Sequence, residues 1–197
     1  MTDSKRILIA YPAGFLCYEK FKRKVDYYTS NSDRFEILCF DDANGFVEKY
    51  ANNIRCGWTI LSSGLECVER STHAILFEDR GCYAELRSII SSAKTPCRVV
   101  PLELTLVVNK DRGEPYDVYV GRGTIWGNPY QIGVDGDREE VIRKFAYDFQ
   151  RGFLKVSDSF DENISKLKGK VIACHCKPAA CHGDIIADYI NALDDGQ

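Results

Sequence analysis

The first hundred residues alternate between short, unbroken apolar runs and longer segments in which apolar residues recur at helical spacing. A strand covered by helices on both faces has such continuous apolar runs, whereas a half-exposed strand alternates apolar and polar residues. The expected strands are residues 7–10, 35–40, 58–61, 74–77 and 97–100, and the expected helices are residues 16–28, 44–53, 64–70 and 83–93. This alternation predicts an α/β fold in which a Rossmann-like parallel sheet is flanked by helices.

The chain changes character near residue 102. Strand-like runs recur at 104–108, 118–120 and 171–173, whereas helical spacing is found over 138–153 and 184–192. A turn rich in cysteine and histidine separates the last expected strand from the last expected helix. We therefore predict a first domain over residues 1–102 and a smaller α/β or α+β domain over residues 103–197.

Composition limits the kinds of partner that the protein can have. Apolar residues are 45% and charged residues 28% of the 197, as in a globular protein, and no apolar run approaches the ~20 residues of a membrane span. The beginning of the chain lacks the pattern of a signal peptide, so the nine cysteines are expected to be reduced thiols in a cytoplasm. The net charge is −3, and residues 101–197 hold 12 basic and 16 acidic side chains, which disfavours duplex nucleic acid as a partner.

The first candidate site lies where the expected parallel strands end, because ligands bind beyond the carboxyl ends of such strands. Gly14 follows the first strand, and Arg80 and Gly81 follow the fourth. A glycine at the start of a helix lets an anion approach the backbone, and an arginine adds a charge-assisted contact. Glu85, one turn into the helix, is placed to contact ribose hydroxyls or to act at a glycosidic carbon.

The segment Arg80-Gly81-Cys82-Tyr83-Ala84-Glu85-Leu86, after the strand at 74–77, resembles the strand, Gly-Thr-x-x-Glu-Leu turn and helix of the SLOG superfamily. That group includes cytokinin-activating phosphoribohydrolases and DNA-processing-protein-A-like domains. The resemblance covers roughly residues 5–100 and implies a Rossmann-like domain that binds nucleotides or nucleotide sugars. Cys82 stands at the family's threonine, and its Gly-Gly phosphate loop corresponds to Asp42-Ala43-Asn44-Gly45. A domain that binds without catalysis is therefore a second interpretation.

The second candidate site is the turn from Cys174 to Asp184, which contains three cysteines and two histidines. Three interpretations are open. Cys174, Cys176, Cys181 and His182 could ligate zinc. Cys181 or Cys176, near the start of the last helix, could be an activated thiolate with His182 as base and Asp184 as its orienting partner. The turn could also form one wall of a binding pocket.

Two motifs in the second half resemble an uncharacterised family common in phage and bacterial genomes, the domain of unknown function numbered 4326. The first runs from Val120 to Pro129 and is like the family's Gly-Arg-x-x-x-Trp-Gly-Asn-Pro. The second runs from Cys174 to Asp184 and is like its Cys-Trp-Cys-x-Pro-x-x-Cys-His-Gly-Asp. His175 departs from the family's tryptophan, so we expect it not to be essential to the family's chemistry.

In the pocket interpretation, Arg122, Trp126 and Asn128 supply a cation, a stacking plane and an amide, a set that suits a base or a nucleotide sugar. The sequence thus predicts a protein that recognises a nucleotide-derived small molecule and, if it is an enzyme, cleaves or transfers at an N-glycosidic bond. Two alternatives are a non-catalytic sensor or sequestering protein, as in phage counter-defence, and a zinc-stabilised interaction module. No cofactor is required, although zinc is an open candidate. A homo-oligomer is also open, and the expected location is a bacterial or phage-infected host cytoplasm.

Overall fold

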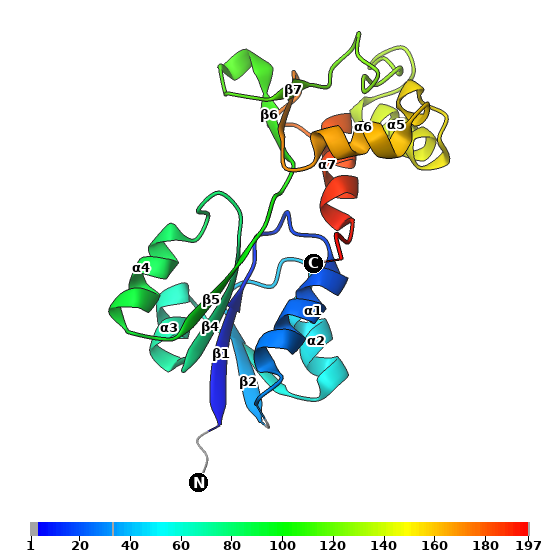
Figure 1. Ribbon diagram of the computed structural model, residues 1–197. Coiled ribbons are helices and arrows are strands. Elements are labelled where there is room, and N and C mark those ends of the chain that lie inside the picture. The colour runs from blue at the N-terminus through cyan, green and yellow to red at the C-terminus, as the bar shows by residue number, and fades with distance from the viewer. Residues whose placement is uncertain (1–3, 33, 197) are drawn as a thin grey trace. The chain divides into compact units, whose positions relative to one another are not determined.

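The computed structural model describes residues 4–32 and 34–196, and its α/β architecture confirms the predicted fold class (Figure 1). Five strands form a parallel sheet in the order β3-β2-β1-β4-β5. The strand order reverses between β1 and β4, which is the position where parallel α/β sheets usually bind ligands. The strands are β1 (Lys5–Ala10), β2 (Phe35–Cys39), β3 (Gly57–Ile60), β4 (His73–Glu78) and β5 (Cys97–Pro101).

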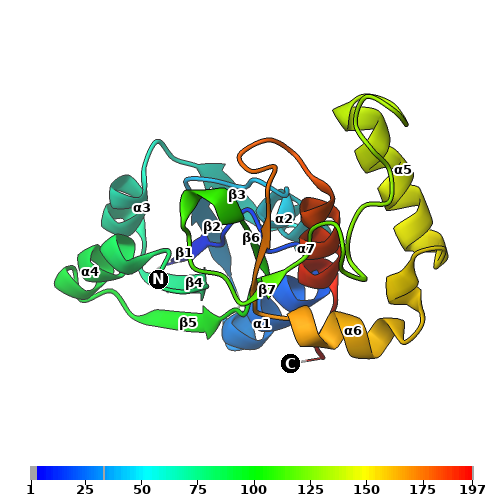
Figure 2. The same cartoon turned by 90° about the horizontal axis from the view of Figure 1, so that it is seen from above.

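Two pairs of helices cover this sheet, α1 and α2 on one face and α3 and α4 on the other (Figures 1 and 2). Leu8, Leu38 and Leu76 in the three central strands are completely buried. This burial on both faces is the physical reason that the strands lack polar alternation. The helices are α1 (Tyr18–Thr29), α2 (Phe46–Ile54), α3 (Gly64–Arg70) and α4 (Ala84–Ser92).

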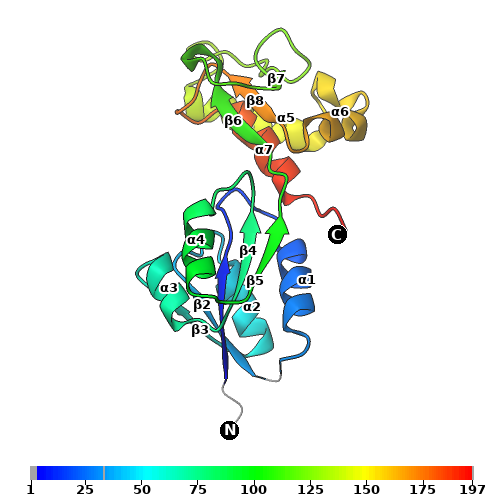
Figure 3. The same ribbon diagram turned by 60° about the vertical axis from the view of Figure 1, so that its left-hand side comes forward.

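The second half forms its own three-stranded sheet in the order β6-β8-β7, with both pairings parallel (Figure 3). Its strands are β6 (Leu106–Asn109), β7 (Val118–Tyr119) and β8 (Val171–Cys174), and its helices are α5 (Arg138–Arg151), α6 (Phe160–Leu167) and α7 (His182–Ala192). Short 3₁₀ turns lie at Lys110–Arg112 and Lys155–Ser157. The predicted closing helix begins two residues earlier than expected, and α6 was not predicted from the sequence.

Contacts divide the chain into two units, Met1–Leu102 with Asp194–Gln197, and Glu103–Leu193. The first unit thus includes the last residues of the chain, which the sequence placed with the second domain. Two ion pairs on α1 account for this, Lys20 with Asp195 at 2.5 Å and Arg23 with Asp194 at 2.9 Å. Within the described residues, no helix has both the length and the apolar character of a membrane span.

A reciprocal hydrogen-bonded pair fixes the beginning of the second unit to its last helix. The Thr105 amide donates to the Asn191 side-chain oxygen at 2.8 Å, and the Asn191 amide group donates back to the Thr105 carbonyl at 3.0 Å. Both residues are buried, so water cannot replace these bonds. The side chain of Asn191 therefore provides hydrogen-bond partners for the backbone N–H and C=O groups of Thr105, the residue that precedes β6.

We predict that Asn191→Leu lowers the free energy of unfolding of the second unit by about 1–3 kcal/mol, because it leaves two buried backbone groups unpaired. Urea unfolding followed by fluorescence in a Trp58→Phe background measures this, since Trp126 then reports on the second unit alone. Asn52→Leu, on an exposed position of α2, is the matched control and should change stability by less than about 0.5 kcal/mol. Equal effects of the two substitutions would contradict this role of Asn191.

Candidate functional site

A pocket of about 230 Å³ lies in the second unit, next to the carboxyl end of β8. Four segments far apart in the sequence form it: the end of β7, the loop that follows β7, the start of α5 and the Cys/His turn. Its polar and ionisable lining residues are Tyr119, Arg122, Asn128, Tyr130, Arg138, Cys174, His175, Cys176, Cys181 and His182. The second candidate site predicted from the sequence therefore coincides with a cavity, and Arg122 and Asn128 border it together with the Cys/His turn.

The loop after β7 is shaped by close packing of its own backbone. A Cβ at Gly127 would lie 2.8 Å from the Gly121 carbonyl oxygen and 2.9 Å from the Arg122 Cα, so only glycine fits there. Trp126 is 6% exposed and packs in the hydrophobic core of the unit. The indole thus anchors the loop and is not among the residues that line the pocket, so a stacking role for Trp126 stays a prediction.

Asn128 is also buried, and the nitrogen and the oxygen of its side-chain amide both form hydrogen bonds with backbone groups. Its Nδ2 donates to the Val141 carbonyl at 3.1 Å, and its Oδ1 accepts from the Tyr130 amide at 2.9 Å. Asn128 thus ties the loop to α5 and positions Tyr130 on the pocket wall. Its contribution to the pocket is mainly this positioning, since its side chain is already hydrogen-bonded at both ends.

Two arginines stand at the mouth of the pocket. Arg122 donates to the Tyr130 carbonyl at 3.1 Å, and Arg138 donates to the Ala180 carbonyl at 3.3 Å. Both residues are exposed. A guanidinium has five N–H donors, so each of these bonds anchors the group and leaves donors for an anion. Arg138 was not recognised from the sequence, because it reads there as an ordinary solvated residue in the first turn of a helix.

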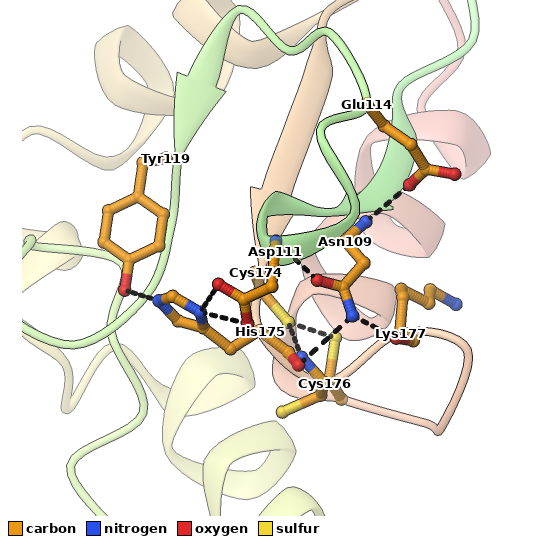
Figure 4. A network of polar contacts seen from close by, with 9 residues as sticks. Asn109, Asp111, Glu114, Tyr119, Cys174, His175, Cys176 and Lys177 are labelled. Atoms are coloured by element: carbon orange, nitrogen blue, oxygen red, sulfur yellow. Dashed lines mark hydrogen bonds and ion pairs between the residues drawn. The ribbon is translucent and has the colours of Figure 1, made fainter.

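A hydrogen-bonded chain of three side chains runs along another side of the pocket (Figure 4). His175 Nδ1 lies 2.8 Å from a carboxylate oxygen of Asp111, and its Nε2 lies 3.0 Å from the Tyr119 hydroxyl. The Lys110 ammonium lies over the Tyr119 ring, 4.5 Å from its centre. Sequence reasoning missed this chain because His175 was expected to be dispensable and Asp111 is 64 residues away from it.

The Cys/His turn is held by a buried asparagine at the end of β6. The Asn109 side chain donates to the carbonyls of His175 and Lys177, and its Oδ1 accepts from the Asp111 amide at 2.7 Å (Figure 4). One side chain therefore fixes both the turn and the residue that orients His175. These bonds replace the sheet hydrogen bonds that the chain loses where β8 ends.

The Cys174 and Cys181 sulfurs lie 3.2 Å apart, and both residues are at most 2% exposed. A hydrogen bond between the two thiols lowers the pKa of Cys174 to about 5 against the opposing effect of burial, and the Cys176 amide donates to the Cys174 sulfur at 3.2 Å. The same hydrogen bond, together with burial, raises the pKa of Cys181. Burial raises the pKa of Cys176, and the adjacent Arg138 guanidinium opposes that shift.

The expected arrangement of Cys181 as nucleophile with His182 and Asp184 is not formed. His182 Nε2 lies 2.8 Å from the Val120 carbonyl, which can only accept, so this nitrogen carries the proton and donates. Asp184 accepts from the Cys181 amide at 2.9 Å and pairs with Lys177 at 2.5 Å. Asp184 therefore caps α7, and in the cysteine pair it is Cys174 rather than Cys181 whose pKa is lowered.

The four residues considered as zinc ligands are only partly brought together. Cys174 and Cys181 are adjacent, but the Nε2 of His182 is occupied by the Val120 carbonyl. Across residues 4–32 and 34–196, no three His, Cys, Asp or Glu side chains are grouped as a metal site would require. Zinc binding by this turn stays a prediction.

In the first unit, Arg80 and Gly81 both adopt the left-handed conformation, with φ of 46° and 73°. This turn reverses the chain between β4 and α4, and Arg80 pairs with Asp79 at 2.6 Å. Glu85 lies in the first turn of α4 and is exposed. The predicted order of Gly81 and Glu85 after a strand is therefore present, but none of the three pockets described for the molecule includes Glu85.

The turn corresponding to the phosphate loop is filled by a carboxylate of the protein itself. Asp42 accepts from the Val47 and Glu48 amides at 2.9 and 3.0 Å, and the Tyr11 hydroxyl donates to it. The Asn44 side chain donates to the carbonyls of Ala13 and Phe15, on either side of Gly14. The amides at the start of α2 that could bind a phosphate thus already donate to Asp42. The segment around Gly14 is held against the same turn by the hydrogen bonds of Asn44.

With this geometry established, comparison with known proteins identifies both halves. Residues 4–108 match the minimal SLOG domain. The chain belongs to this family. Residues 107–192 match the domain of unknown function DUF4326, so both resemblances seen in the sequence are confirmed. An uncharacterized 12.4 kDa protein from the nrdA-td intergenic region of Enterobacteria phage T4 is 43% identical over 91 residues, which are 46% of this chain and 81% of that protein. No solved structure matches the chain.

For the second half of this minimal SLOG protein, we predict that ultraviolet absorbance detects one thiolate at neutral pH. The signal should disappear as the pH falls through about 5, because protonation of Cys174 then overcomes the hydrogen bonds from Cys181 and Cys176. Cys181→Ala should move the midpoint upward, toward the ordinary thiol value of 9.0, by removing the hydrogen bond that lowers the pKa of Cys174 most. Cys176→Ser keeps its backbone donor and is the control. A wild-type midpoint near 9 would show that Cys174 is an ordinary thiol.

Proposed function

We propose that this protein binds a nucleotide-derived small molecule in the pocket of its second unit. The observation that carries the proposal is the convergence of Arg122, Arg138, Tyr119, Tyr130 and His175 on one cavity of about 230 Å³. Arginine suits phosphate, and tyrosine offers an aromatic face together with a hydroxyl. The size favours a mononucleotide, or the terminal part of a larger nucleotide derivative.

The chemistry of the lining supports this ligand class. Arg122 is anchored through the Tyr130 carbonyl, and Arg138 through the Ala180 carbonyl and the Cys176 side chain. A guanidinium has five N–H donors, so both groups keep donors that can hold a phosphate at the mouth of the pocket. Apolar side chains, among them Val141 and Ile142, complete the wall and favour a flat base over a fully charged ligand. The minimal SLOG domain adds a second, nucleotide-related ligand-binding fold in the same chain.

We predict that Arg138→Gln weakens nucleotide binding by at least about tenfold, which corresponds to the loss of one charge-assisted hydrogen bond. Isothermal titration calorimetry of the full chain with each of the four common ribonucleoside monophosphates measures this. Arg143→Gln is the matched control, because Arg143 lies on the same helix, is highly exposed and does not line the pocket. Its substitution should change affinity by less than about twofold.

Two results would contradict this assignment. One is that none of the four nucleotides binds to the wild-type protein. The other is that Arg138→Gln and Arg143→Gln bind equally well, in which case the nucleotide lies elsewhere. Arg122→Gln provides an independent check from the opposite side of the pocket and should resemble Arg138→Gln.

A second candidate function is cleavage or transfer at an N-glycosidic bond, with Glu85 as the acid or base. The order β4, Gly81, α4 and Glu85 in a member of the minimal SLOG family supports it. The exposure of Glu85 and the internally filled start of α2 support the alternative, in which the protein senses or sequesters an intact nucleotide. We place either activity in the cytoplasm of a bacterium or a phage-infected host.

Glu85→Gln distinguishes the two. If Glu85 acts in acid–base catalysis, this variant should release base from the four nucleotides at least about a hundredfold more slowly than the wild type. Chromatography of long incubations measures the released base, and Glu69→Gln, an exposed glutamate on α3, is the control. Nucleotide recovered intact from the wild-type protein would exclude catalysis on these substrates and favour the sensor.

A further inference from the structure

The proposed binding function assigns no chemistry to two neighbouring cysteines of the second unit, Cys174 and Cys181. Cys174 ends β8 and Cys181 caps α7, and their sulfurs are 3.2 Å apart. A disulfide bond is about 2.05 Å long, so the two sulfurs need to approach by only about 1 Å. Sulfurs held so close on two fixed elements can be joined without rearranging the fold.

Both sulfurs are also reachable by a small molecule. Although both residues are nearly completely buried from bulk water, Cys174 and Cys181 line the pocket of about 230 Å³. A water molecule occupies about 30 Å³ of liquid, so this space accommodates hydrogen peroxide easily. A larger oxidant would have to pass the arginines and tyrosines at the mouth.

We propose that Cys174 and Cys181 form a reversible dithiol–disulfide site that is oxidised by hydrogen peroxide entering through the pocket. The Cys174 sulfur, which lies 3.2 Å from the Cys181 sulfur and accepts a hydrogen bond from the Cys176 amide, is the attacking atom. The site requires no nucleotide, so its test is independent of the proposed function.

The reaction proceeds in two steps. In the first, the Cys174 sulfur attacks one peroxide oxygen and the O–O bond breaks. The other oxygen leaves as water with the proton that the Cys174 thiol gives up, which makes Cys174 a sulfenic acid. In the second, the Cys181 sulfur attacks the Cys174 sulfur and the S–O bond breaks. The hydroxyl leaves as a second water with the thiol proton of Cys181. Two thiols are thereby oxidised to one disulfide, and one peroxide is reduced to two waters.

Cys176 provides a contrast within the same turn. It lines the pocket and is only half-buried, so peroxide reaches it at least as easily. Its backbone amide, however, donates to Cys174, and its side chain lies beside Arg138. The proposal therefore requires that Cys176, the more accessible thiol, stays reduced while the two buried thiols, Cys174 and Cys181, form the disulfide because they are adjacent.

Peptide mapping of the 197-residue chain tests this directly. Trypsin does not cleave the Lys177–Pro178 bond, so one peptide, residues 171–197, carries all three cysteines. The protein is treated with peroxide, denatured, alkylated with iodoacetamide and then digested. We expect this peptide to lose the mass of two hydrogens and to gain one alkyl group, on Cys176. Treatment with dithiothreitol before alkylation should restore three alkyl groups.

Two variants keep the result interpretable. Cys176→Ser should still form the disulfide and leave no alkylated cysteine in the peptide, whereas Cys181→Ser should form none. Three alkyl groups after peroxide treatment of the folded wild type, or a disulfide that includes Cys176, would overturn the proposal. It would also be overturned if native mass spectrometry found one zinc ion per chain that protects all three thiols from peroxide.

Discussion

The second unit depends on β8, the strand that pairs with β6 on one edge and β7 on the other. The backbone N–H and C=O groups of β8 therefore find hydrogen-bond partners in the two neighbouring strands. Beyond Cys174, where the strand ends, the backbone needs other partners. The Asn109 side chain, at the end of the neighbouring β6, supplies such a partner by donating hydrogen bonds to the carbonyls of His175 and Lys177. The same end of the sheet therefore has the fixed backbone and the exposed polar edge that a binding site requires.

The two units use their helix starts in opposite ways. At the start of α2, the carboxylate of Asp42 accepts the amides that could bind a phosphate, so an incoming anion would meet a negative charge already in place. In the second unit, arginines rather than amides face the pocket, and the amide of Cys181 is taken by Asp184. The side chains suited to an anion are thus those of the second half, and this is why we propose that the nucleotide binds there.

The sequence predicted the larger sheet well because burial on both faces leaves a direct signature, as in Ile7-Leu8-Ile9-Ala10. It missed α6, a short helix in a polar stretch, because eight residues give too few turns for a clear period. The pocket could be predicted only in part. Arg122 and Cys174 belong to recognisable motifs, whereas Arg138 and Asp111 become neighbours of those motifs only through tertiary packing.

Residues of one motif can serve opposite purposes, and this determines how the loop after β7 should be understood. Arg122 and Trp126 are four residues apart, yet the arginine faces the pocket and the tryptophan is in the core. The close approach of Gly127 to the Gly121 backbone forces this separation, because it folds the loop back on itself between the two side chains. The buried indole then fixes the loop as a rigid wall, so a guanidinium on its outer side is already in position for an anion. In the proposed function, the role of the tryptophan is therefore to reduce the entropy lost when the loop binds, rather than to touch the ligand.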